Sequence, residues 1–446
     1  MVRWELDYSF GGVLLESWEV SDDAKTYTLN LRHDAIWNNG DPFTADDVVF
    51  NIERWCDKSA EGNAMASRFA SLIDEETQRA GTGAIEKVDE YTVRLNLPRP
   101  DITLIAAMAD HPALLVHPSF SGSIVDTPIG TGPFELVSHV VGEKAVFKRR
   151  ESGWWGGQAH LEGIEFLDFG TDPSTIVAAF DAGEIHVNDN TSADFVEVLD
   201  GLGLERKEKA TANTIVARMR ADSAPYDNID VRRAIQMAVD NEVVLELGIN
   251  GTGVVAENHH CAPFHPEYAE IGNPEFNPSK AKEMRDAAGH ADTEFELISL
   301  DGDWRQTTTD AIAAQLRDAG FNVKRKIIPG STFWNDWTKY PFSTTNWGAR
   351  PLGVQIYGLA YKSGEPWNES GFSNEDFDGK LEEAVGIADP EKRQPLMAEL
   401  QNILRDSGVI IQPFWQSQYL HHVPALKGYE RHQQFEARFD NVWLEQ

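Results

Sequence analysis

The sequence predicts an α/β protein with two lobes, each assembled from separate parts of the chain. Three observations lead to this fold class. The chain has 446 residues, which is too long for a single hydrophobic core. Residues 295–328 have the pattern strand, helix, strand, which is a crossover between parallel strands. The strand segments after the last helix have no helix of their own, so we expect them to return to the middle of the chain.

The first 125 residues predict a small α+β module. Residues 27–32 alternate apolar and polar side chains, as a half-buried strand does. Thr44 and Asp47 have the spacing of a capping box and predict the start of a helix. A second alternating strand is expected at 92–97.

A stiff Gly/Pro segment at 128–133 separates this module from the next section. Its glycines lack the spacing of a nucleotide-binding loop. Local patterns then predict the following elements: strands at 134–141, 145–149 and 217–219, and a helix at 174–180.

The section from Asn228 onward has clear helix caps. Asn277-Pro278 places a cap before a proline in the first turn, and Gly289 follows at the C-terminal end. The first expected helix begins at Asn228 or Asp230. The others run from Asn241 to Gly248, from Asn277 to Gly289, from 305 to 319, and from Asp389 to Gly408. The expected strands are 295–300, 321–328 and 409–415.

Composition and charge exclude several classes of function. A formal net charge of −33 is unfavourable for binding nucleic acid or an anionic membrane surface. No apolar run reaches transmembrane length, and the N-terminus lacks the apolar segment of a signal peptide. Cys56 and Cys261 are too few and too far apart for a disulfide framework, so each is expected to be a lone thiol.

Motifs for catalysis are absent from the sequence. It contains no GxSxG or HExxH pattern, and with 72 acidic residues, pairs of carboxylates occur by chance. His259-His260-Cys261 has metal-ligand residue types, but adjacent side chains diverge, so we expect a polar loop at a lobe edge. His421-His422 is expected in a polar turn. We therefore predict no catalytic residue, no metal site and no cofactor.

The segment from Phe333 to Trp367 is the strongest candidate for ligand recognition. It is rich in aromatic residues, and no Asp or Glu occurs between Trp337 and Gly364, where the chain's own frequency would place about four or five. Aromatic faces around the cation Arg350 suggest a surface for a small organic ligand. The alternative is an aromatic-rich core loop.

Arg305 is a second candidate. It is expected at the start of the helix that follows strand 295–300. The carboxyl end of a parallel strand is where α/β folds bind ligands, and helix N-termini attract anions. The alternative is a solvated surface arginine.

Five separated stretches resemble one family, the extracellular solute-binding proteins of family 5, which are receptors of ABC importers for peptides, nickel and oligosaccharides. They follow the family's order along essentially the whole chain. The stretches are LLESWEVSDDAKTYTLNLRHDAIWNNGDPFTADDVVFNIERW (14–55), PIGTGPFELV (128–137) with GWW (153–155), FDAGEIHV (180–187, with His186 where Asp is usual), NIDVRRAIQMAVDNEVVLELGINGTG (228–253) and FNPSKAKEMRDAAG (276–289).

The resemblance implies a two-lobed periplasmic binding protein-like fold of type II, cluster C. It places an extra α+β subdomain of the first lobe at 1–125, the first lobe at 126–221 plus 410–446, and the second lobe at 222–409. Family members have several tens of residues before the LLESWEV motif, so thirteen residues here imply a truncated N-terminus.

The resemblance also implies how such a receptor acts. The lobes close about hinge strands near 215–219 and 410–414, a small-molecule or short-peptide ligand is held in the interlobe cleft, and the closed receptor docks on the permease subunits. A periplasmic monomer without direct membrane insertion or nucleic-acid binding is expected. A peptide-binding chaperone of the same fold, or a hydrolase, are the alternatives.

In the dipeptide-binding relatives, the loop that corresponds to 346–351 carries an aspartate that binds the amino terminus of the peptide. This loop contains no acidic residue here, and Arg350 lies close to the position of that aspartate. We therefore expect a carboxylated, neutral polar or sugar-like solute to fit better than an ordinary dipeptide. The candidate ligand-binding residues are Arg350, Trp347, Trp337, Trp334, Trp367, Arg305, Trp415 and Asn346.

Overall fold

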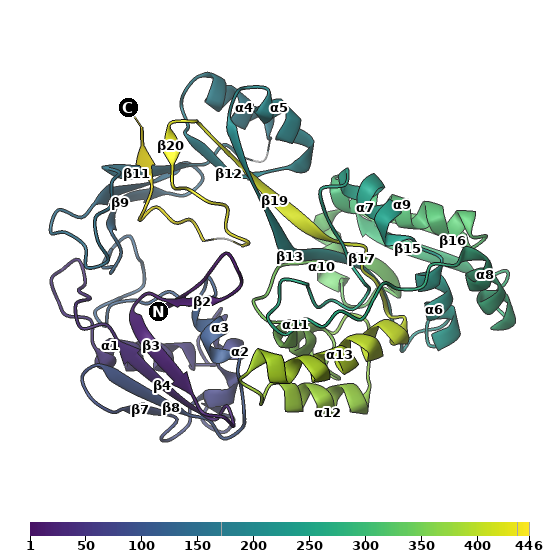
Figure 1. The fold of residues 1–446 in the computed structure, drawn as a ribbon, viewed down its shortest axis with the longest axis horizontal. Helices are drawn as coiled ribbons and strands as arrows, with labels where there is room; N and C mark the ends of the chain where they lie inside the picture. Colours follow the sequence, from purple (N-terminus) through teal and green to yellow (C-terminus); the bar gives the residue numbers. More distant parts are fainter. Residues whose placement is uncertain (171, 435, 446) are drawn as a thin grey trace. The chain divides into compact units, whose positions relative to one another are not determined.

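The computed structural model describes residues 1–170, 172–434 and 436–445. They form two compact units: unit 1 comprises Met1–Glu208 and Gln418–Gln446, and unit 2 comprises Lys209–Ser417. The chain passes between the units twice, within strand β13 (Glu205–Met219) and within strand β19 (Phe414–His422) (Figure 1). Within the described part of the chain, no helix combines the length and the apolar character that a membrane crossing requires.

Unit 1 begins with an antiparallel sheet whose strand order is β3-β4-β8-β7. Helix α1 (Ala45–Trp55) packs its apolar residues into the same core as this sheet. The predicted capping box is confirmed, because Asp47 Oδ2 accepts the backbone N–H of Thr44 at 2.7 Å. The strands are β3 (Leu15–Val20), β4 (Thr26–Leu31), β7 (Ile85–Lys87) and β8 (Thr92–Asn96).

The rest of unit 1 contains a three-stranded antiparallel sheet of order β11-β10-β9, which includes both strands predicted after the Gly/Pro segment. The predicted helix at 174–180 is also present, as α4. From residue 134 onward, the elements of unit 1 are β9 (Phe134–Val140), β10 (Lys144–Arg149), β11 (Gly163–Leu167), α4 (Ser174–Asp181), β12 (Val187–Thr191), α5 (Val196–Asp200), β20 (Leu426–Lys427) and β21 (Trp443–Leu444). The remaining elements before residue 134 are β1 (Val2–Trp4), β2 (Phe10–Gly12), α2 (Met65–Arg68), β5 (Ile73–Asp74), β6 (Arg79–Ala80) and α3 (Leu104–Met108).

The sheet of unit 2 has the strand order β19-β13-β17-β15-β16. Strand β15 (Glu294–Leu300) is parallel to β16 (Asn322–Ile328) and to β17 (Phe342–Trp347), and α9 (Trp304–Asp318) connects β15 to β16. The predicted parallel crossover is therefore confirmed. Figure 1 shows α9 beside α7 (Asn241–Ile249) at this sheet, and the two helices share one hydrophobic core with β15.

Two predicted strands have different bounds in the structure. The short strand expected at 217–219 is the end of the fifteen-residue β13. The strand expected at 409–415 is interrupted, because the chain forms β18 (Ile410–Ile411) and then β19, with Pro413 between them. Proline has no backbone N–H to donate to a ladder, which accounts for the interruption.

Most helices of unit 2 begin where their caps predict. The side chains of Asn228, Asn277 and Asp389 each accept a backbone N–H of the first turn. Helix α7 runs one residue past the predicted end and stops at Asn250, which has left-handed backbone angles. The other helices are α6 (Ile229–Met237), α8 (Pro278–Ala287), α10 (Gly330–Asp336), α11 (Gly353–Ala360), α12 (Glu375–Ala384) and α13 (Pro390–Ser407), and the short strand β14 (Gly253–Val255) pairs with β19.

Gly408 ends α13, and a substitution there tests how α13 packs against α6 in unit 2. Its φ is +69°, and a Cβ there would lie 2.8 Å from the backbone nitrogen of Arg233 in α6. Because both the backbone angle and the neighbour resist a side chain, we expect Gly408→Ala to lower the free energy of unfolding by about 1–3 kcal/mol.

Gly379, inside α12, is the matched control, since a Cβ there meets nothing within 4 Å. Gly379→Ala should instead stabilise by about 0.5–1 kcal/mol. Unfolding in guanidinium chloride measures both changes. An unfolding free energy of Gly408→Ala equal to or above that of the parent protein would contradict the proposed packing.

Candidate functional site

The carboxyl ends of three parallel strands of unit 2 lie at one edge of the sheet. Strands β15, β16 and β17 end there at Leu300, Ile328 and Trp347. Helix α10 is fixed against this edge by Phe333, which is fully buried among Ile298, Leu300 and Ile328. Arg305, the pair Trp334 and Trp337, and residues 346–350 therefore lie at or just after the ends of these strands, which is where open α/β sheets bind ligands.

Strand β17 presents different chemistry on its two faces. Thr344 Oγ1 bonds Thr309 Oγ1 of α9 at 2.8 Å, and Asn346 Oδ1 accepts from Arg305 Nε of the same helix at 2.9 Å. Thr345 and Trp347 point to the other face, since successive side chains of a strand alternate. The candidate site thus has an Arg305–Asn346 side and a Trp347 side.

Arg305 lies in the first turn of α9, as predicted. Asp303 caps this helix by accepting the backbone N–H of Arg305 at 2.9 Å, and its carboxylate also pairs with the Arg305 guanidinium. Asp303 has a φ of +90°, which is strained for a residue with a side chain. The arginine is therefore held between Asp303 and Asn346 at the strand edge and is partly buried.

Four tryptophans form an aromatic group on the other side, which we call the tryptophan cluster: Trp334, Trp337, Trp347 and Trp367. The rings of Trp337, Trp347 and Trp367 are mutually in contact, with centroids 6.0–6.1 Å apart, and Trp334 lies 6.2 Å from Trp337. Trp347 is 5% exposed, whereas Trp334 and Trp367 are 44% and 47% exposed. Large exposed indoles in contact with buried ones are typical of a binding surface.

His260 connects this cluster to Trp415 of β19. The imidazole lies 5.9 Å from the Trp347 ring and 6.0 Å from the Trp415 ring, and its Nδ1 is 2.6 Å from the hydroxyl of Tyr361. Burial lowers the pKa of His260 well below its usual value and raises that of Tyr361, so both are neutral. The indole N–H of Trp415 is buried and has no acceptor among the described residues.

The loop that carries Arg350 is held from two sides. Asn213 Oδ1 of β13 accepts the N–H of Ala349 at 2.8 Å. His265 Nδ1 accepts the N–H of Ala262 at 3.0 Å, so its Nε2 carries the proton and donates to the carbonyl of Arg350 at 2.9 Å. The guanidinium of Arg350 is half-buried and donates to the carbonyls of Gly348 and Ala349.

His259-His260-Cys261 does not form the polar edge loop that the sequence predicts. All three side chains are buried, and each contacts a polar side chain of unit 2. The partners are Glu257 and Gln401 for His259, Tyr361 for His260 and His265 for Cys261. Among the described residues, no group of three or more His, Cys, Asp and Glu side chains is arranged to hold a metal ion.

His421-His422 is also not in a polar turn. Both residues belong to β19 and are buried. His421 Nδ1 lies 2.9 Å from Thr191 Oγ1 of β12, and its Nε2 lies 3.2 Å from Asp200 Oδ1. Burial lowers the pKa of His421. The two cysteines are free and buried, as predicted.

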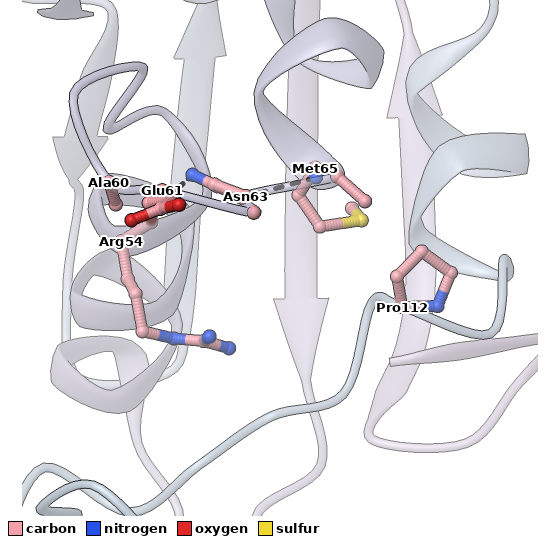
Figure 2. A pocket seen from close by; sticks show the side chains of 8 residues that line it. Arg54, Ala60, Glu61, Asn63, Met65 and Pro112 are labelled. Atoms are coloured by element: carbon pink, nitrogen blue, oxygen red, sulfur yellow. Dashed lines mark hydrogen bonds between the residues drawn. The ribbon is translucent and has the colours of Figure 1, made fainter. Parts of the chain in front are cut away.

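Unit 1 contains a separate polar pocket near the start of α2, lined by Arg54, Ala60, Glu61, Gly62, Asn63, Ala64, Met65 and Pro112 (Figure 2). Two of its polar side chains bind the local backbone. The Asn63 amide donates to the carbonyls of Arg54, Trp55 and Asp57, and Arg54 Nη2 donates to the carbonyl of Leu114 at 2.7 Å. This pocket contains none of the predicted site residues.

The structure also identifies residues that the sequence analysis missed. Glu369 accepts the indole N–H of Trp347 at 2.8 Å and pairs with Arg218 Nε of β13 at 2.9 Å. Arg218 is the only charged residue of the otherwise apolar run 215–219, which could have indicated a buried partner, because buried charges are paired. The sequence around Glu369 contains no comparable signal.

Comparisons with known proteins agree with this architecture. A relative in Haemophilus influenzae, heme-binding protein A, is 25% identical over 93% of this chain and 81% of its own length. A dipeptide-binding protein of Pseudomonas aeruginosa is 26% identical over 88% of this chain and 79% of its own length.

Solved structures show the same fold. The ABC transporter substrate-binding protein CtaP of Listeria monocytogenes superposes with a TM-score of 0.85 at 18% identity, covering 99% of this chain and 92% of its own. NikA of Brucella suis in complex with Fe(III)-EDTA superposes with a TM-score of 0.80 at 24% identity, covering 100% of this chain and 93% of its own. The predicted two-lobed periplasmic binding protein-like fold is confirmed.

The family profile of the bacterial extracellular solute-binding proteins, family 5 Middle, matches residues 10–369. Members of this family are binding receptors found in the periplasm or outside the cell. The match covers more than half of the chain, in agreement with the predicted resemblance. The protein belongs to the bacterial extracellular solute-binding proteins of family 5.

Proposed function

We propose that this protein is the periplasmic receptor of an ABC importer and that its solute carries a carboxylate or neutral polar groups next to a flat ring. The receptor captures the solute by lobe closure, delivers it to the permease subunits and needs no catalysis of its own. Strands β13 and β19, which carry the chain between the units, contain or adjoin the predicted hinge segments 215–219 and 410–414. The extra subdomain at 1–125 stays a prediction.

The proposed ligand chemistry rests on one observation. The candidate site contains arginines and tryptophans, but its loop 346–351 contains no acidic side chain that could bind an ammonium group. The loop 346–351 contains Arg350 and no Asp or Glu. Glu369 lies directly behind Trp347, but three donors already occupy its carboxylate: Arg218 Nε, Thr345 Oγ1 and Trp347 Nε1. A peptide ammonium would therefore find no counter-charge there, whereas a carboxylate would find Arg350 and Arg305.

The relatives bind chemically diverse solutes, so membership of the family leaves the ligand open. Their names include heme-binding and dipeptide-binding proteins, and one structural neighbour is the binding protein AgaA in complex with agropinic acid. Among such classes, the chemistry of the residues at the strand edge supports a carboxylated or neutral polar solute. The proposed ligand-binding set is Arg350, Arg305, Asn346, Trp334, Trp337, Trp347, Trp367 and Trp415.

Titration calorimetry against a panel of solutes tests the proposed ligand class. The panel contains dipeptides, their N-acetylated forms, di- and tricarboxylates, and oligosaccharides. We expect a carboxylated or sugar-like solute to bind at least about tenfold more tightly than any unmodified dipeptide, because one charge-assisted hydrogen bond is gained and an unpaired ammonium is avoided. Sub-micromolar binding of an ordinary dipeptide would overturn the proposed ligand class.

Arginine substitutions test which cations contact the solute. Arg350→Gln and Arg305→Gln should each weaken binding of the best carboxylated solute by about 10–100-fold, because each removes a charge-assisted hydrogen bond whose free energy corresponds to that factor. Arg317→Gln is the matched control, since Arg317 lies in the last turn of the same helix α9 and donates to the carbonyl of Val323 at 3.0 Å.

The control variant should bind like the parent protein in the same calorimetric titration. If Arg350→Gln and Arg305→Gln also keep the parent affinity, neither guanidinium contacts the solute. The proposed role of the two cations would then be wrong.

A further inference from the structure

A buried ion pair lies directly behind the tryptophan cluster. Arg218 of β13 and Glu369, in the loop after α11, have side-chain exposures of 0% and 4%. Glu369 Oε2 accepts from Arg218 Nε at 2.9 Å and from Thr345 Oγ1 at 2.7 Å, while Oε1 accepts from Trp347 Nε1 at 2.8 Å. The carboxylate is thus fixed by three donors from two neighbouring strands.

The other end of the Arg218 guanidinium holds the C-cap of α10 and the short segment that follows it. Its two terminal nitrogens donate to the carbonyl oxygens of Trp337 and Tyr340. Carbonyls at a helix C-terminus lack partners within the helix and carry partial negative charge, so a cation is favoured there. Burial lowers the pKa of Arg218, and the charge of Glu369 opposes this shift.

Every member of the tryptophan cluster is linked to this ion pair. Trp347 is bound through its indole N–H and Trp337 through its carbonyl. Trp367 is bound through the chain, because the backbone N–H of Glu369 donates to the carbonyl of Trp367 at 2.8 Å. Trp334 lies one turn before Trp337, and their rings are in contact.

We propose that Glu369, together with Arg218, is the positioning residue of the tryptophan cluster and thereby sets its preference for flat, ring-bearing solutes. Glu369 does not touch the solute. It fixes the angle of the Trp347 indole, against which Trp337 and Trp367 stand at 67° and 60°. The ligand role of the cluster rests on the proposed function, whereas the positioning itself does not.

Substitution of Glu369 by glutamine tests the positioning without a ligand. Arg218 Nε and Trp347 Nε1 donate to different oxygens of the Glu369 carboxylate. A glutamine has only one oxygen, which cannot stand at both positions, so its NH2 group would face one of the two donors. The probe is the set of indole N–H resonances of the full chain labelled with ¹⁵N-tryptophan, which contains 13 tryptophans. Trp347→Phe assigns the Trp347 resonance.

In Glu369→Gln we expect the Trp347 indole N–H to shift and to exchange with solvent about tenfold faster, since its acceptor is lost or shared. The resonances of Trp337 and Trp367 should shift with it. Tryptophans of unit 1, such as Trp18 and Trp55, should stay in place.

Glu267→Gln is the matched control. Glu267 is a buried carboxylate of the same unit that pairs with buried Arg393 at 3.5 Å and accepts the N–H of Val354 at 3.2 Å, and neither of these partners is a tryptophan. This variant should leave the four cluster resonances unchanged. Equal shifts in both variants would show a general loosening of unit 2 and would overturn the proposal.

Thr345→Val keeps the proposal testable if Glu369→Gln fails to fold. It removes one neutral donor to Glu369 and keeps the shape of the side chain. We expect a smaller shift of the Trp347 resonance in the same direction, and unchanged cluster resonances in a folded variant would overturn the proposal. If these shifts occur but no solute of the panel binds, the positioning holds and the proposed function fails.

Discussion

The ion pair between Arg218 and Glu369 is the interaction on which the binding edge of unit 2 depends most. Removing one partner of a buried pair costs about 3–5 kcal/mol, because the remaining charge stays buried without compensation. Here the pair also satisfies the carbonyls of Trp337, the C-cap of α10, and of Tyr340, and the indole of Trp347. Strand β13, strand β17, helix α10 and the loop after α11 are thereby joined at one point.

This arrangement gives the site an unusual electrical character for so acidic a protein. Two acids near the strand edge are already engaged: Glu369 by Arg218, Thr345 and Trp347, and Asp303 by the guanidinium and backbone of Arg305. Arg350 and Arg305 bring positive charge to the loops after β17 and β15. On this basis the proposed solute is anionic or neutral, although the chain carries a net charge of −33.

Much of unit 2 could be predicted from the sequence because its signals are local. Asn228, Asn277 and Asp389 cap helices within three residues of themselves, and the crossover 295–328 has the expected strand and helix periods. The segment 333–367 was harder, since its aromatic residues hide the alternation of β17. Its division into α10, β17 and α11 depends on packing against β15 and β16.

The candidate site was predicted in part for the same reason. The aromatic and cationic residues are visible in the sequence, but their supports are not. His265 bonds a carbonyl 85 residues away, and Glu369 bonds an arginine 151 residues away. His259 and His260 were expected at a surface, because the partners that make their burial favourable, Gln401, Gln412 and Tyr361, come together only in the fold.

Native mass spectrometry of the protein purified without unfolding tests the central claim most directly, since a receptor of this kind retains its solute. The account predicts a released small molecule that bears a carboxylate or hydroxyl-rich ring and does not react with an amine-specific reagent. Release of an unmodified dipeptide with a free amino terminus would contradict it.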